Sequence, residues 1–162
     1  MIRHSLFTAA LILAASAAAA PKTMAQTVDI PFAGTVGGGC TFDTPIAGIL
    51  AVQGPVGTPT SLRGDSFING GSRGKVNVVC SQPASLTVSL PVQTGGPTFT
   101  PIFSDASVES PAGVTSSFPG SSPIPLPSNA TGTPLEVKMF VDKGSTLQAG
   151  NYQYNVTLTI VP

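Results

Sequence analysis

Apolar and polar side chains alternate at every second position in four segments of the chain, residues 75–80, 85–90, 135–141 and 152–160. Successive side chains of a β-strand point to opposite faces, so this period of two is typical of antiparallel strands with one buried and one solvent-facing side. The predicted inward residues are Val76, Val78 and Cys80, then Leu86, Val88 and Leu90, then Leu135, Val137, Met139 and Val141, and finally Tyr152, Tyr154, Val156, Leu158 and Ile160.

The segments between these strands are less regular. Residues 81–84 predict a turn, so that residue 80 ends one strand of a hairpin. A short strand is expected at residues 47–53, and residues 54–74 are expected to be mostly loop, with brief pairing at 66–68. In the stretch 91–134, rich in proline, serine and glycine, short edge strands are expected near 98–103 and 113–118, with an exposed extended connection at 121–128. No segment after residue 25 has the pattern of a helix, because glycine, proline, serine and threonine are too frequent.

The first 25 residues predict a secretory signal peptide. A short basic start precedes an uninterrupted run of small and apolar residues from Leu6 to Ala20, and small residues flank the expected cleavage point after Ala25. The alternative, a membrane anchor, is disfavoured because the run is short, rich in alanine and has no stop-transfer flank. The mature chain is expected to comprise an N-terminal extension, residues 26–39, and one domain, residues 40–162.

Composition bears on the classes of function to be considered. The only histidine, His4, and the basic residues Arg3 and Lys22 leave with the signal peptide, so no Ser-His pair and no basic cluster remain. There is no G-x-S-x-G elbow, no phosphate-binding loop and no cluster of metal ligands. We therefore expect no enzyme activity, no cofactor, no metal site, no nucleic-acid partner and no membrane insertion of the mature chain. An enzyme with a carboxylate pair would require two of the scattered acidic side chains to face each other in a cleft.

The two cysteines, Cys40 and Cys80, are expected to form one disulfide in an exported protein. A loop of about 40 residues closed in this way is worth roughly 4 kcal/mol in the chain-entropy model. Free or metal-binding thiols are the alternative, and they would need several carboxylates to complete a zinc site. About seven short strands, turns of glycine and proline, and one long-range disulfide predict an immunoglobulin-like antiparallel β-sandwich that lacks the usual tryptophan.

Residues 28–36 also alternate, and they lie between the expected cleavage site and the G-G-G run at 37–39. Val28, Ile30, Phe32 and Val36 would share one face of an extended strand, with Gly34 in the same row. Such a strand could pair within its own sandwich or enter another molecule.

Three features together resemble the pilin subunits of chaperone–usher fimbriae and the related spore-coat-U-like secreted proteins of bacteria. They are the alternating row that ends shortly before Cys40, the position of Cys80 at the end of an alternating strand, and the final segment 147–161 with its A-G-N-Y entry at 149–152. The resemblance implies an immunoglobulin-like sandwich that is missing its last strand and has a hydrophobic groove in its place. A periplasmic chaperone would fill the groove first, and the extension of the next subunit would fill it afterwards.

Carried over by residue, the resemblance makes Val28, Ile30, Phe32 and Val36 the side chains that enter the groove of a neighbour, and Gly34 the position of close approach. Pro31 departs from the pattern, because it removes one backbone donor from a strand that would pair on both edges.

The implied function is a structural subunit of an extracellular fimbria or surface fibre, assembled by donor-strand complementation and mediating adhesion. Its partners would be neighbouring copies or homologous subunits, a periplasmic chaperone and an outer-membrane usher, and it would cross the periplasm to the cell surface. The alternative is a monomeric secreted adhesin or carbohydrate-binding β-sandwich domain with a self-completed fold.

Overall fold

The computed structural model describes residues 39–161. The chain divides into two units, residues 1–35 and 36–162, and every described residue belongs to the second. The described part consists of strands and connections without any helix, and so it contains none that could cross a membrane. The strands are β1 (Cys40–Phe42), β2 (Ala51–Gln53), β3 (Ser61–Gly64), β4 (Gly74–Cys80), β5 (Ala84–Val88), β6 (Val92–Gly95), β7 (Phe103–Ser110), β8 (Gly113–Ser116), β9 (Ile124–Leu126), β10 (Asn129–Asp142), β11 (Gln153–Asn155) and β12 (Leu158–Val161).

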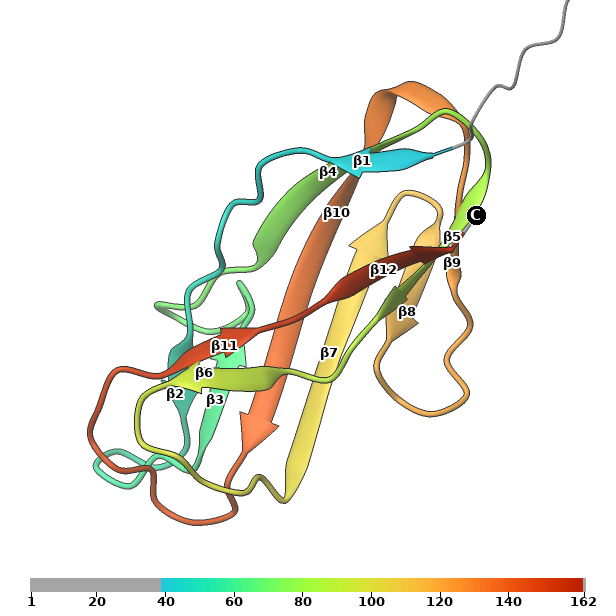
Figure 1. Cartoon of the computed structure of the whole chain (residues 1–162). Helices are drawn as coiled ribbons and strands as arrows, with labels where there is room; N and C mark the ends of the chain where they lie inside the picture. The colour runs from blue at the N-terminus through green and yellow to red at the C-terminus, as the bar shows by residue number, and fades with distance from the viewer. Residues whose placement is uncertain (1–38, 162) are drawn as a thin grey trace, which may run out of the picture. The chain divides into compact units, whose positions relative to one another are not determined.

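A large antiparallel sheet is built around β10, the longest strand (Figure 1). Along one edge β10 pairs first with β4 and then with β3, while its other edge pairs with β7. Strands β1, β2 and β8 extend the sheet from β4, β3 and β7, respectively.

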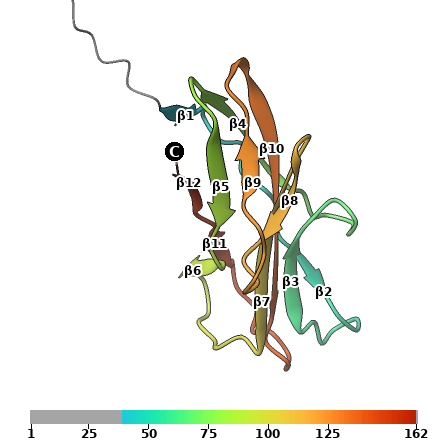
Figure 2. The same ribbon diagram turned by 90° about the vertical axis from the view of Figure 1, so that its right-hand side faces the viewer.

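The second layer contains the strands β12-β5-β9 and the short pair β11-β6. In Figure 2, β5, β6, β11 and β12 lie on one side and β10, β3 and β2 on the other. The prediction of an all-β, antiparallel, sandwich-like fold is confirmed.

The core between the layers is aliphatic. The buried cluster consists of Val78, Cys80, Leu86, Val108, Ile124, Leu126 and Leu135, contributed by both layers. Full burial of such a side chain contributes about 1.5–3 kcal/mol. None of the phenylalanines in the described part is buried, so the aromatic side chains lie at the surface or along grooves.

The disulfide is also confirmed. Cys40 and Cys80 are bonded, and they lie directly opposite each other in the register of β1 and β4. The bond therefore fastens the first strand of the domain to the large sheet.

Several alternating segments are placed as predicted. Leu135 and Val141 are buried on the inner face of β10, and Val78 and Cys80 are buried on β4. Leu90, however, was expected to face inward and is 52% exposed, because β5 ends at Val88.

The connections differ more from expectation. The turn after Cys80 does not close a hairpin, because β4 belongs to the large sheet and β5 to the second layer. Residues 66–68 form turns instead of pairing, and the strand in this region is β3, where Leu62 is 2% exposed and pairs with Val141. The structure of these segments depends on burial against residues that are distant in the sequence, and local composition does not reveal such contacts.

The proline-rich stretch also contains more structure than expected. The strand expected near 98–103 begins only at Phe103, and it forms the inner strand β7 rather than an edge. The expected edge strand near 113–118 is present as β8. Residues 121–128 are not a wholly exposed connection, because Ile124 and Leu126 of β9 are each 1% exposed in the core.

Candidate functional site

An open groove of about 870 Å³ runs beside the last strand of the domain. One wall is formed by residues 42–50 and the other by residues 151–158. The floor between them includes Gly64, Gly74, Val76, Val137 and Met139, from β3, β4 and β10. The groove thus lies where the two layers of the sandwich separate at one side.

The first wall is attached to the large sheet at isolated points. Ile46 forms a single antiparallel bridge with Lys75, and Ile49 forms another with Ser72. On the other edge of this wall, no strand of the described part is paired. Phe42, Ile46 and Ile49 are therefore 41%, 66% and 59% exposed, which leaves apolar surface open along the groove.

Two residues explain why the first wall is not a regular strand. Pro45 has no N–H to donate to a ladder. Gly48 packs so closely against the sheet that an added Cβ would lie 2.8 Å from both the Gly74 nitrogen and the Ser72 carbonyl oxygen. A side chain at position 48 would push this wall away from the floor.

The second wall runs through β11 to the first residue of β12, and within the described part each of these two strands pairs on one edge only. The other edge of this wall faces the groove, since β12 is the end strand in the order β12-β5-β9. Thr157 shows the orientation of the backbone, because its N–H donates to Ser89 Oγ and its carbonyl accepts from the Ser89 N–H. Backbone groups alternate between the two edges of a strand, so those of Val156 and Leu158 point toward the groove.

The side chains of this wall follow the predicted alternation. Tyr152, Tyr154, Val156, Leu158 and Ile160 are half-buried, and the residues between them are exposed. Leu158 and Ile160 pack against the buried core, and the residues from Tyr152 to Leu158 line the groove. Inward-facing side chains remain half-covered here because no other strand of residues 39–161 lies over them.

Both tyrosines place their hydroxyls on polar partners. The Tyr152 hydroxyl donates to the Gln148 carbonyl at 2.8 Å, and the Tyr154 hydroxyl is 3.4 Å from Gln93 Oε1. Burial, together with the neighbouring Tyr152, raises the pKa of Tyr154 above its usual value. Both tyrosines line the groove.

The groove offers apolar surface and unpaired backbone rather than reactive groups. Its charged lining residues are Asp43, which accepts from Asn77, and Lys75, whose ammonium lies 3.0 Å from Glu136. Within residues 39–161 there is no group of three or more side chains suited to hold a metal ion. Such a site suits an extended peptide, which supplies main-chain hydrogen bonds and alternate apolar side chains.

The residues predicted to enter a partner, Val28, Ile30, Phe32, Gly34 and Val36, lie outside the described residues. The first wall was missed at the sequence level, because Ile46 and Ile49 are three residues apart and do not follow a period of two. The three glycines of the groove were missed as well, since Gly48 of the first wall and Gly64 and Gly74 of the floor come together only in the folded sheet.

No protein-family model, no curated protein and no solved structure matches this chain. Its function is therefore inferred from the residues and the geometry of the groove.

Proposed function

We propose that the protein is a structural subunit of an extracellular fibre, and that its groove accepts residues 28–36 of a neighbouring copy as an additional strand. The single observation that carries the proposal is the apolar groove between two strand edges that are unpaired within the described part. The sequence supplies a fitting occupant in Val28, Ile30, Phe32 and Val36, which alternate with small or polar residues.

The dimensions of the segment and the groove agree. A strand rises about 3.3 Å per residue, so residues 28–36 would extend over roughly 30 Å and the wall of residues 151–158 over roughly 26 Å. Each apolar side chain that is buried contributes about 1.5–3 kcal/mol before the cost of ordering the strand. Pro31 removes a donor from only one edge of the inserted strand and leaves the ladder on the other edge intact.

The topology favours a neighbouring copy as the source. Cys40 pairs with Cys80, and Val161 pairs with Ser85, so the chain enters the domain and the last strand ends at the same end of the sandwich (Figure 1). A segment folded back before Cys40 onto its own groove would run parallel to β12, whereas a segment from a neighbour is free to run antiparallel. The first wall runs opposite to β12, so either orientation is parallel to one of the two walls; the neighbour's segment gains the slightly more stable antiparallel pairing along β12. Repeated head-to-tail insertion generates an open fibre.

The same proposal includes export and assembly partners. An apolar groove that residues 39–161 leave open needs cover before the neighbour arrives. By resemblance to chaperone–usher pilins, we expect a periplasmic chaperone to cover the groove and an outer-membrane usher to assemble the subunits. The final location would be the cell surface.

A complementation experiment tests the proposal. In chains that begin at Gln26, Phe32→Arg disables the donor segment, and Ile46→Arg places a charge on the exposed wall of the groove. Each variant alone should remain monomeric by light scattering, while an equal mixture should form a one-to-one complex in which an intact segment fills an intact groove. Val114→Arg is the matched control, because Val114 is 62% exposed on β8, away from the groove, and Ile46 is 66% exposed.

The alternative of a self-completed monomer gives a different result. In that case the wild-type chain would be monomeric, and both Phe32→Arg and Ile46→Arg would lower its melting temperature without any complex appearing on mixing. That outcome would refute the fibre-subunit function.

A further inference from the structure

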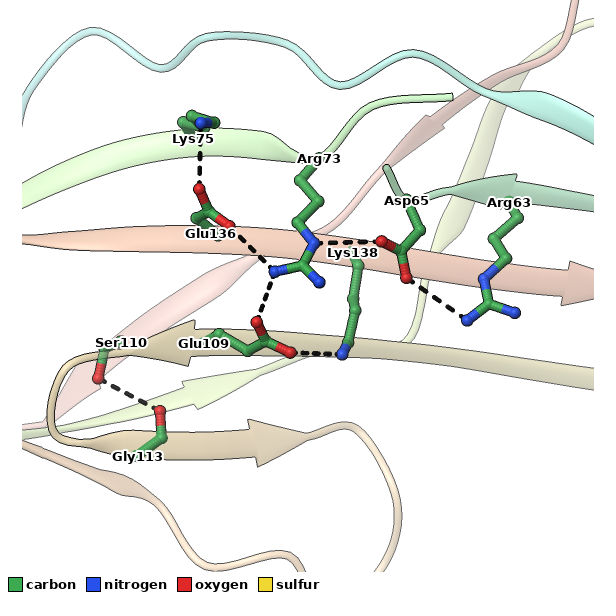
Figure 3. A network of polar contacts seen from close by, with 9 residues as sticks. All are labelled: Arg63, Asp65, Arg73, Lys75, Glu109, Ser110, Gly113, Glu136 and Lys138. Atoms are coloured by element: carbon green, nitrogen blue, oxygen red, sulfur yellow. Dashed lines mark hydrogen bonds and ion pairs between the residues drawn. The ribbon is translucent and has the colours of Figure 1, made fainter. Parts of the chain in front are cut away.

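Seven charged residues form one ion-pair cluster on the large sheet (Figure 3). Glu136 and Lys138 alternate along β10 with Val137 and Met139, which line the groove, so the two sets of side chains point to opposite faces. The members of the ion-pair cluster are Arg63, Asp65, Arg73, Lys75, Glu109, Glu136 and Lys138.

Arg73 is the centre of the ion-pair cluster. Its Nε donates to Asp65 Oδ1 at 3.1 Å, and its Nη1 contacts Glu109 Oε2 at 2.5 Å and Glu136 Oε2 at 3.0 Å. These carboxylates come from the end of β3, from β7 and from β10. The Arg73 side chain is only 12% exposed, and its guanidinium also lies 5.6 Å from the centre of the Phe67 ring. The cluster therefore holds this side chain from several elements at once.

The backbone on either side of Arg73 belongs to the groove. Ser72 exchanges backbone hydrogen bonds with Ile49 of the first wall, at 3.0 and 3.1 Å, and Ser72 Oγ accepts a further bond from the Ile49 N–H. Gly74 lies in the groove floor, against Gly48. Ser72 precedes β4, which starts at Gly74, so the ladder with β10 does not fix its position. Beside the pairing of Gly74 with Val137, the Arg73 side chain is a second connection between this backbone and the rest of the sheet.

We propose that Arg73 is a positioning residue of the groove: its guanidinium, held by three carboxylates, keeps the Ser72 backbone against Ile49 and so fixes the first wall. A docked strand that pairs with this wall is released faster when Arg73 is lost. The identity of the docked strand rests on the proposed function, but the attachment of the wall does not.

Arg63 provides a matched control within the same ion-pair cluster. It also contacts Asp65, at 3.4 Å, and carries the same charge. Arg63 lies inside β3, where its backbone pairs with Phe140 and Ala51 in regular ladders, so losing its side chain leaves the wall attached. A change specific to Arg73 therefore separates positioning from a general loss of ion pairs.

Because three carboxylates hold Arg73, its effect on the first wall should depend on pH. Burial works to raise the pKa of Asp65, but the bond from Arg73, the Phe67 amide and the nearby guanidinium charges outweigh it and hold the pKa below its usual value. Lys138 and Arg73 lower the pKa of Glu109, and Lys75 and Arg73 lower that of Glu136. Arg63, Lys75 and Lys138 are the other cations that face these carboxylates, and Asp105 lies beside the cluster near Lys138. Protonation below about pH 4 should release Arg73.

The test uses chains with Phe32→Arg, whose own donor segment is disabled, and a fluorescent peptide of residues 26–37. Arg73→Gln should raise the dissociation rate of the peptide at least tenfold at pH 7, Arg63→Gln less than threefold, and Arg73→Lys should fall between them. With Arg73 present, dissociation should accelerate as the pH falls below about 4, and with Arg73→Gln it should vary little.

Amide exchange in the unliganded chains supplies a readout that needs no peptide. The Ile49 amide, which donates to Ser72, should exchange faster in Arg73→Gln and remain unchanged in Arg63→Gln. Equal effects of both variants on peptide release and on Ile49 exchange would overturn the positioning role. If the peptide bound to none of the chains, the proposed function would fail, and the Ile49 comparison would still decide the role of Arg73.

Discussion

The second layer of the sandwich has two edges, and they differ in chemistry. At one edge, β9 carries Pro125 opposite Ser85, and Pro123 and Pro127 flank the strand. At the other edge, residues 151–161 contain no proline and no charged residue. One edge of the same layer is closed to further pairing, and the other is left open beside an apolar groove.

The closed edge follows from the missing N–H of proline. Because Pro125 cannot donate, the ladder to β5 must be carried by Ile124 and Leu126, whose partners are Leu86 and Ala84. The backbone of Pro125 then points away from β5 and presents no donor to an approaching strand. Proteins block edge strands in this way to prevent aggregation, so an unblocked edge beside apolar surface supports the proposed role in strand acceptance.

The largest effect on assembly is expected when a proline is placed on the open edge, as it occurs on the closed edge. The backbone of Val156 points toward the groove, so Val156→Pro removes a donor there without touching the bonds between Thr157 and Ser89. Fibre assembly should be lost completely, while far-ultraviolet circular dichroism and the melting temperature of the monomer change little. Unchanged assembly by electron microscopy would contradict the role of this edge.

Removal of the disulfide should have the next largest effect, because it fastens the wall side of the sandwich. A double Cys40→Ser, Cys80→Ser variant is expected to lose about 2–5 kcal/mol of unfolding free energy. Urea unfolding of this variant and of the reduced wild-type chain measures the loss. A difference below 1 kcal/mol would show that the first strand needs no covalent attachment.

Acid should lower the unfolding free energy by protonating the carboxylates of the ion-pair cluster. The pKa values of Asp65, Glu109 and Glu136 are lowered in the folded chain, so their stabilisation is present above the unfolded values near pH 4 and is lost as the pH falls through the folded ones. The unfolding free energy should be flat from pH 7 to 5 and should fall below about pH 4. Arg73→Gln should flatten this fall, and an identical pH profile in the variant would count against the cluster as its source.

The smallest effect is expected from opening the closed edge. Pro125→Val restores an N–H on β9, where Pro125 is exposed, and should change the unfolding free energy by less than about 1 kcal/mol. The concentration at which the monomer associates should nevertheless decrease, as measured by light scattering. No change in association would mean that the proline does not protect this edge.

The sequence predicted those strands in which buried and exposed side chains alternate at every second position. Leu135 and Val141 of β10 and Val78 of β4 are buried as the alternation indicated. β9 follows the same rule, since Ile124 and Leu126 alternate with prolines, but the density of prolines favoured the interpretation of an exposed connection.

The groove and the ion-pair cluster were less predictable, because both depend on distant residues. Arg73 meets Glu109 and Glu136 across sequence separations of 36 and 63 residues. The first wall can be identified only in the folded chain, where Ile46 and Ile49 form bridges with residues of the large sheet. The alternation along residues 152–160 was visible in the sequence, but only the topology shows that no strand of the described part pairs with their open edge.

Hydrogen exchange on the last strand tests the central claim most directly. In the Phe32→Arg chain, titration with the peptide of residues 26–37 should protect the amides of Val156 and Leu158, which face the groove, and that of Ile160 on the same strand edge. The Thr157 amide, already bonded to Ser89, should change little. Protection at the amides of Val156, Leu158 and Ile160 is the result that strand acceptance predicts. Amides that are already protected without peptide, or that remain unprotected at saturating peptide, would contradict it.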